Sequence, residues 1–129
     1  MELHVDLRWL LDRQEDLLGK ELAVRDYSGL MAAVARHKVD SPSIDVAEPD
    51  AYWRAAALLD TLVLLRPLAA CNAFFAYGVT VAYIRASGKT VDDGFEPWGT
   101  LIRDLRDLRE LRLSVYDIAD RLRSMQPGV

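Results

Sequence analysis

Three residues capable of polar chemistry lie close together in the middle of the chain: Arg66, Cys71 and Asn72. They stand between one apolar helical segment and the start of the next. A guanidinium beside the amino end of a helix would suit an anion, because the first backbone N–H groups and the helix dipole both favour negative charge there. The alternative is that Arg66 covers the carboxyl end of the preceding helix or pairs with an acid such as Asp60.

Cys71 and the aromatic residues that follow it each allow two interpretations. An exposed thiol at a helix amino terminus can become a nucleophile. No histidine or acid lies near Cys71 in the sequence, and small buried cysteines are common, which favours a structural role. The aromatic side chains could line a cleft, although their helical spacing is more typical of a core. These aromatic residues are Phe74, Phe75, Tyr77 and Tyr83.

A second candidate surface is the stretch 39–50, which contains two prolines, two serines and several acids. Loops of this length inside a compact domain are often functional, so we expect a partner-binding loop here. Its candidate residues are His37, Val39, Ser41 and Ile44. His37 could serve as a displaced base, but a single histidine beside Lys38 is more typical of a solvated side chain.

The arginines at positions 103, 106, 109 and 112 recur every three residues and alternate with acids. Pairs such as Arg103 with Asp107 and Arg106 with Glu110 are typical of a solvated helix face. The stripe could instead bind an acidic partner.

Composition limits the function classes. The chain has 129 residues, a formal charge of −4 and a pI near 5.1, which argues against nucleic-acid binding. Two histidines and one cysteine leave little to build a metal site or a disulfide, so we expect neither a metal nor a cofactor. No basic start followed by an apolar run is seen in residues 1–12, and we expect a cytoplasmic location.

Helical periodicity dominates the chain and predicts an all-α, single-domain bundle of about six helices covering residues 1–129. The expected ranges are 6–18, 26–37, 51–65, 71–87, 97–113 and 114–125. Residues 67–84 carry no charge, but Pro67, Asn72, Gly78 and Thr80 interrupt them. We therefore expect a buried central helix there and no membrane span.

The centre of the sequence resembles the Fic/Doc (death-on-curing) family. Members of its Doc branch carry a motif of the form HPFxDGNKR, and this chain reads RPLAACNAF over residues 66–74. The Ala-rich approach over residues 54–59 and the exit over residues 81–88 are also similar. Residues 24–36 resemble the segment that leads into the family's target-binding flap, and residues 113–122 resemble its closing helix. The resemblance implies a Fic/Doc-like bundle over nearly the whole chain.

The residues that differ from the motif are those to which the family owes its chemistry. Arg66 stands where the family has its catalytic histidine, and an arginine stays protonated and cannot act as a general base. Pro67 and Asn72 are retained, and Leu68 replaces the anchoring phenylalanine. Ala70 replaces the acid that holds the metal, and Cys71 replaces the glycine. Ala73 and Phe74 replace the cationic pair. AMP transfer and kinase activity of the Fic/Doc type are therefore not expected.

These observations predict a catalytically degenerate Fic/Doc-like protein, a pseudoenzyme that acts by binding. It would be a toxin-like component or a regulator of a toxin–antitoxin type system, and the resemblance implies an antitoxin-like helix as partner. The alternative is a repurposed cleft that binds or transforms a small molecule with Arg66, Asn72 and Cys71. A third option is a structural module that self-associates.

Overall fold

The computed structural model describes residues 3–19, 23–39, 49–107 and 113–127. The described part of the chain contains six helices and no strand, which confirms the predicted all-α class. The helices are α1 (Leu7–Leu18), α2 (Tyr27–His37), α3 (Ala51–Leu65), α4 (Asn72–Ala86), α5 (Phe95–Arg106) and α6 (Val115–Ser124).

Polar side chains determine where four of these helices begin. Asp6, Asp26 and Asp50 each accept a hydrogen bond from a backbone N–H in the first turn of α1, α2 and α3. At α6, Ser114 and Asp117 bond reciprocally to each other's backbone N–H and form a capping box. Each of these contacts satisfies an N–H group that has no partner within its own helix.

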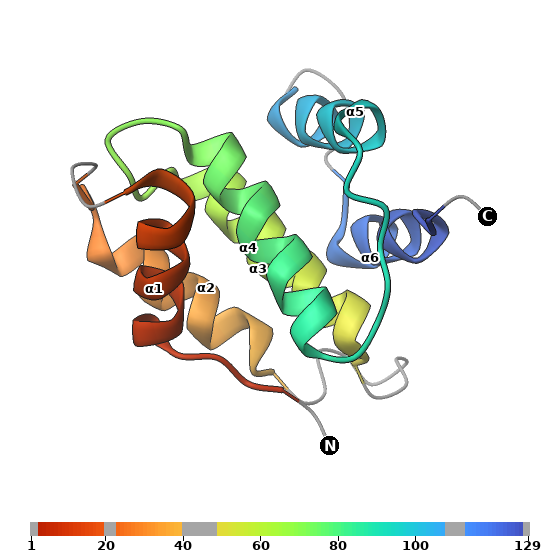
Figure 1. Ribbon diagram of the computed structural model, residues 1–129, viewed down its shortest axis with the longest axis horizontal. Coiled ribbons are helices and arrows are strands. Elements are labelled where there is room, and N and C mark those ends of the chain that lie inside the picture. Colours follow the sequence, from red (N-terminus) through yellow and green to blue (C-terminus); the bar gives the residue numbers. More distant parts are fainter. Residues whose placement is uncertain (1–2, 20–22, 40–48, 108–112, 128–129) are drawn as a thin grey trace.

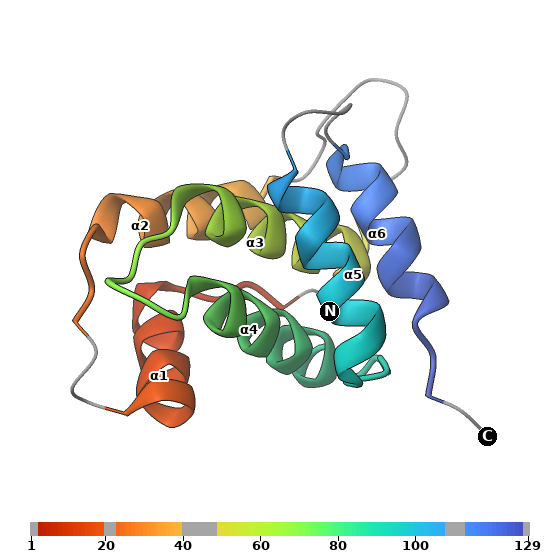
Figure 2. The same cartoon turned by 90° about the horizontal axis from the view of Figure 1, so that it is seen from above.

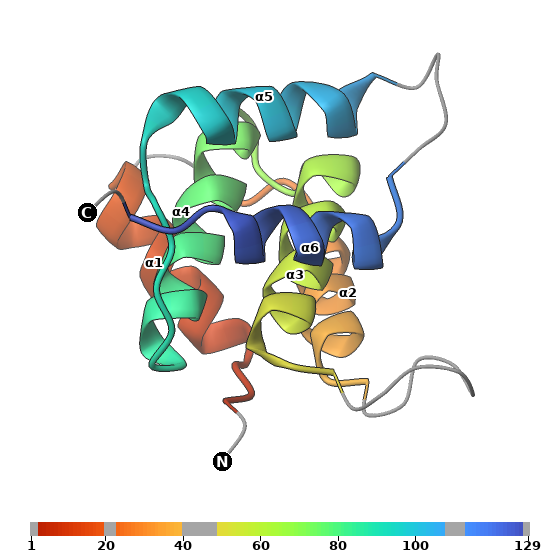
Figure 3. The same ribbon diagram turned by 90° about the vertical axis from the view of Figure 1, so that its right-hand side faces the viewer.

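Helices α3 and α4 lie side by side at the centre, with α1 and α2 on one side and α5 and α6 on the other (Figure 1, Figure 2). Every residue of α3 from Trp53 to Val63 is buried. This burial follows from the sequence, because that run is apolar on all faces of the helix apart from a few polar positions. Helices α5 and α6 run across the central pair (Figure 3).

A glycine allows α1 to approach α4 closely. A Cβ atom built on Gly78 would lie 2.4 Å from Cδ1 and 2.8 Å from Cδ2 of Leu17. The Leu17 side chain therefore occupies the space that any other residue at position 78 would need.

The connection between α3 and α4, residues 66–71, is held from the side by the segment that precedes α2. The carbonyl of Pro67 accepts hydrogen bonds from the backbone N–H groups of Arg25 and Asp26 at 2.8 and 2.9 Å. Next to it, Val24 and Leu68 form an isolated antiparallel bridge. This connection is therefore part of the packed structure.

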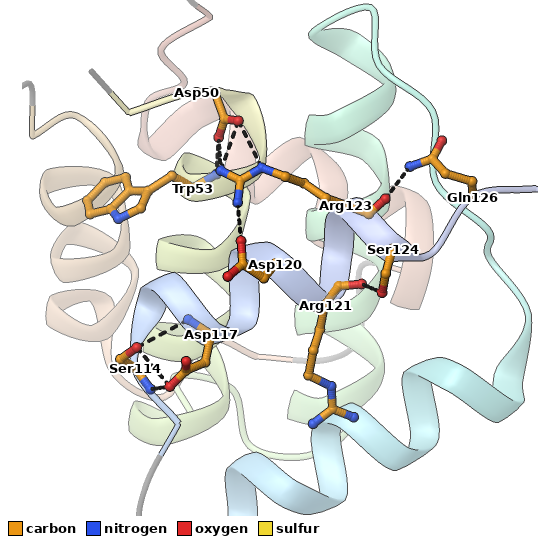
Figure 4. Close-up of polar contacts among 9 residues, drawn as sticks. All are labelled: Asp50, Trp53, Ser114, Asp117, Asp120, Arg121, Arg123, Ser124 and Gln126. Atoms are coloured by element: carbon orange, nitrogen blue, oxygen red, sulfur yellow. Dashed lines mark hydrogen bonds and ion pairs between the residues drawn. The ribbon is translucent and has the colours of Figure 1, made fainter. Parts of the chain in front are cut away.

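An ion pair links the start of α3 to the end of α6 (Figure 4). Arg123 donates from Nη2 and Nε to the Asp50 carboxylate at 2.8 to 3.0 Å, and from Nη1 to Asp120 at 2.6 Å. Asp50 also caps α3 by accepting from the Trp53 N–H. One carboxylate thus caps one helix and binds another.

The predicted range of α5, 97–113, was wrong at both ends. The helix begins at Phe95, because Pro97 is tolerated within a first turn, where its missing N–H has no partner to lose. It ends at Arg106, because Asp107 adopts an extended backbone conformation. Residues 108–112 lie outside the described ranges.

The uncharged stretch 67–84 is divided between the α3–α4 connection and α4. In the described ranges, no helix combines the length and the apolar character that crossing a membrane requires.

Candidate functional site

The α3–α4 connection brings the predicted polar residues together. Arg66, Cys71 and Asn72 line one small cavity of about 270 Å³. Val63, Ala73 and Arg106 complete its described lining. Arg106 comes from α5, so a tertiary contact adds a second guanidinium beside that of Arg66.

Two residues of this connection have left-handed backbone conformations that non-glycine residues rarely adopt. Arg66 has a φ of 45° and Cys71 a φ of 60°. Arg66 ends α3 by donating its backbone N–H to the carbonyl of Leu62 at 3.2 Å. The two unusual residues therefore stand at the end of one helix and immediately before the next.

The exposed side chain of Arg66 forms no hydrogen bond or ion pair with the rest of the described chain. The predicted alternative pairing with Asp60 was wrong, because Asp60 accepts from Arg36 at 2.7 Å. Asp60 is buried on α3 a turn and a half before Arg66, and α2 supplies its cation. The Arg66 guanidinium is thus available to a ligand.

Pro67 and Asn72 hold the connection in shape. The Asn72 side-chain oxygen accepts from the Leu68 N–H at 2.9 Å, and its nitrogen donates to the Leu68 carbonyl at 3.0 Å. Pro67 is buried, and its carbonyl already accepts two hydrogen bonds. Both residues therefore fix the backbone around the cavity, and the Asn72 amide is largely used for that purpose.

Cys71 was expected to be a buried structural residue, and the structure corrects this: its thiol is exposed. The reason is its place immediately before α4, at the surface end of that helix. No side chain caps α4, so the first backbone N–H groups of the helix lack the usual polar partner. They lie beside the cavity that Cys71 and Asn72 line.

A larger, apolar groove adjoins the cavity. Its volume is about 780 Å³, and it lies between the first two turns of α4 and the whole of α5. Its described lining residues are Ala73, Phe74, Tyr77, Phe95, Trp98, Gly99, Ile102, Arg103, Arg106 and Asp107. Ala73 and Arg106 line both the groove and the polar cavity, so the two are adjacent, and we call them together the depression.

Aromatic rings form one end of the groove. The Tyr77 ring lies edge-on to Trp98 at 5.2 Å and contacts Phe95 at 6.5 Å between ring centroids. The Tyr77 hydroxyl donates to the Asp93 carbonyl at 2.7 Å, and burial, followed by the charge of Asp93, raises its pKa. This hydrogen bond anchors the ring and leaves its apolar faces to the groove.

Phe74 and Phe95 are the exposed aromatic members of the groove, with 42% and 83% of their surface accessible. The two predicted roles of the aromatic residues are thus both realised: Phe74 and Tyr77 line the groove, whereas Phe75 and Tyr83 are core. Phe95 was missed because α5 was expected to begin at Pro97. Its spacing from Trp98 and Ile102, three and seven residues, is the signal that could have found it.

His37 is not a loop residue, and the expectation that it is solvated or acts as a base was wrong. It is the last residue of α2 and is fully buried. Its Nε2 accepts from the Val5 N–H at 3.0 Å, and its Nδ1 contacts the Val34 carbonyl. Burial lowers its pKa to about 4, so the ring is neutral at physiological pH.

The other residues of the predicted partner loop give little to the site. Val39 is partly exposed, and its carbonyl accepts from the buried Arg54 at 3.2 Å. Ser41 and Ile44 lie outside the described residues. Val39 lies near the start of α3, whereas Arg66 follows its end, and a helix of 15 residues spans about 22 Å. The structure therefore does not bring these two candidate surfaces together.

The described residues contain no group of three histidine, cysteine, aspartate or glutamate side chains placed to hold a metal ion. The chemistry that the depression offers is recognition: aromatic surface at one end, and guanidinium groups with free helix N–H groups at the other. Compared with family models, with curated proteins and with solved structures, the chain has no match.

Proposed function

We propose that this chain acts by binding a protein partner, as a catalytically degenerate Fic/Doc-like toxin component or regulator. The partner contributes a short segment that lies in the groove between α4 and α5. An antitoxin-like helix is the segment that the sequence resemblance suggests.

The observation that carries the proposal is the exposed aromatic surface of this groove. Phe95 leaves 83% of its surface in water and Phe74 42%, and the half-buried Tyr77 contacts both rings. Contiguous exposed apolar surface of this kind typically marks an interaction site, because covering it removes apolar area from water. Aromatic side chains are also enriched among the residues that contribute most to binding energy.

The residues around the connection support binding rather than group transfer. Arg66 cannot take a proton from a hydroxyl group at physiological pH. Alanines at positions 70 and 73 offer neither a carboxylate for a metal nor a cation for a phosphate.

The test is co-expression and co-purification of this chain with any short protein that a neighbouring gene encodes. We expect a complex that Phe95→Asp abolishes, because the substitution places a charge on the apolar surface. Tyr27→Asp is the matched control, since Tyr27 is also an exposed aromatic residue, 55% accessible, but lies on α2. The proposal fails if no complex forms, or if both variants bind as the unmodified chain does.

A second candidate function is recognition of a small anionic molecule in the 270 Å³ cavity, which Arg66, Cys71 and Asn72 line together. A thermal-shift screen of nucleotides, phosphates and carboxylate metabolites tests it. A true ligand raises the melting temperature of the unmodified chain but not of Arg66→Ala, because losing a charged hydrogen bond costs about 1.5–3 kcal/mol of affinity. A screen without shifts, or shifts that survive in the variant, would exclude this candidate.

A further inference from the structure

We infer that the segment bound in the groove is amphipathic and acidic, with its apolar residues at the Phe95 end and a carboxylate between Arg66 and Arg106. This inference rests on the proposed function, since it names the chemistry of the partner at the same site.

The polarity of the depression carries the inference. At one end, Tyr77 lies among the rings of Phe95 and Trp98. At the other end, the groove adjoins the polar cavity at the two residues that line both, Ala73 and Arg106. A segment that fills the whole depression therefore meets aromatic surface first and guanidinium groups last.

The cationic end offers charges that are free to bind. Neither Arg66 nor Arg106 pairs with an acid in the described chain. Arg103, which also lines this end, contacts only the Thr100 hydroxyl, at 3.4 Å, among the described residues. The predicted pairing of Arg103 with Asp107 is therefore not formed, and that of Arg106 with Glu110 lies outside the described residues.

Among the described residues, the nearby acids leave this end with an excess of positive charge. Asp104 is paired with Arg121 at 2.8 Å on the side of α5 that faces α6. Asp107 lines the groove but has an interaction of its own. Because the chain as a whole carries a charge of −4, a patch with three arginines is a local reversal of sign, which would orient an acidic segment.

The start of α4 supports the same ligand chemistry. The helix has no side-chain cap, so its first N–H groups and its dipole add to the attraction for a carboxylate. A bound segment with a neutral or basic end would leave these N–H donors and both guanidinium groups without a partner.

The first part of the test selects short peptides from a displayed random library on the full chain, with Phe95→Asp as counter-selection. We expect the enriched peptides to combine apolar residues with an aspartate or glutamate at one end. Enriched peptides without acids, or no enrichment over Phe95→Asp, would overturn the inference.

The second part is a charge exchange. For an enriched peptide, Arg106→Glu should weaken binding by about tenfold or more, and replacing the peptide's acid with lysine should restore it. Arg8→Glu is the control, since Arg8 is an exposed arginine on α1 that lies outside the groove. The inference is contradicted if Arg106→Glu and Arg8→Glu weaken binding equally. It is also contradicted if the lysine-containing peptide does not restore binding to Arg106→Glu.

The outcomes separate the inference from the proposed function. Co-purification of the neighbouring protein together with failed peptide selection overturns the acidic segment and leaves the function standing. Selection of acidic peptides without co-purification supports the chemistry of the site and rejects the expected partner.

Discussion

His37 shows how burial can assign a role that its residue type does not predict. The ring is enclosed by the chain, contacts the Tyr83 ring at 5.9 Å between centroids, and accepts from the Val5 N–H. A proton on Nε2 would break that bond and place a charge in the core. His37 therefore stabilises the fold as a neutral ring, and its effect on stability depends on pH.

We expect the free energy of unfolding to fall as the pH decreases from about 6.5 to about 4. His37 has a pKa of about 4 when folded and 6.5 as an ordinary side chain, so in this window the unfolded chain binds one more proton. Stability is then lost on acidification, by up to about 1.4 kcal/mol per pH unit. Urea unfolding across this window measures the slope.

The matched variants for this pH dependence are His37→Gln and His4→Gln. Glutamine can accept the Val5 hydrogen bond but does not titrate, so His37→Gln should lose most of the slope. His4 is exposed, and its ring lies 5.9 Å from that of His37 between centroids. Its charge adds to the lowering of the His37 pKa, but burial is the larger cause, so His4→Gln should keep most of the slope. A slope that persists in His37→Gln would assign the titration to another group.

At this same scale, the sequence located the α3–α4 connection but not its geometry. The predicted range 51–65 ends where α3 ends, and the polar residues that follow it were predicted as a candidate site. The left-handed conformations of Arg66 and Cys71 could not be predicted, because neither residue type favours positive φ. Arg66 adopts this conformation as the C-cap that ends α3, and the hydrogen bonds between Pro67 and the segment before α2 hold the connection that follows.

Among the helices, local signals were sufficient where a cap or a proline marks a boundary. The predicted starts at positions 51 and 114 agree with α3 and α6 to within one residue, and Asp50 and Ser114 cap these two helices. A capping side chain contacts backbone groups only a few residues away, so a helix start of this kind can be predicted without knowledge of the fold. For α5 no side-chain cap exists at the start, and the predicted range was wrong.

Two glycines in helices allow a comparison that isolates packing. Gly99 on α5 has open space where a Cβ atom would lie, so Gly99→Ala should stabilise the chain by about 0.5–1 kcal/mol through helix propensity. Gly78→Ala gains the same propensity but displaces Leu17, and we expect a net loss of about 1 kcal/mol. Urea denaturation of both variants measures the difference.

A double variant tests the cause of the Gly78 effect. Leu17→Ala removes the atoms that the new methyl group would meet, so Gly78→Ala should cost less in that background than in the unmodified chain. If the two substitutions are additive, the contact between α1 and α4 is not what limits position 78.

Over the whole molecule, the sequence predicted the class of fold but not the depression. The groove exists because α5 lies across the first turns of α4, and the order of elements does not determine which helix crosses which. Arg106 illustrates this: it is exposed, as the sequence indicated, and packing also places it in the same cavity as Arg66. The proposed partner surface is a consequence of this tertiary arrangement.

The replaced motif residues lead to the last prediction, which concerns transfer chemistry. Incubated with labelled ATP, magnesium and either a cell lysate or elongation factor Tu, the unmodified chain should transfer no label, because Arg66 cannot deprotonate an acceptor. The variant that combines Arg66→His, Ala70→Asp, Cys71→Gly, Ala73→Lys and Phe74→Arg restores the motif implied by the resemblance.

The structure favours folding of that restored variant. Ala70, Cys71 and Phe74 are exposed, so the new side chains replace little core, and glycine at position 71 suits a φ of 60° better than cysteine does. Labelling by this variant would support the resemblance, and keeping Arg66 while restoring the other positions should remove the labelling again, since the base is then missing. Robust labelling by the unmodified chain would contradict the binding role, because transfer would then proceed without the base, the acid and the cationic pair.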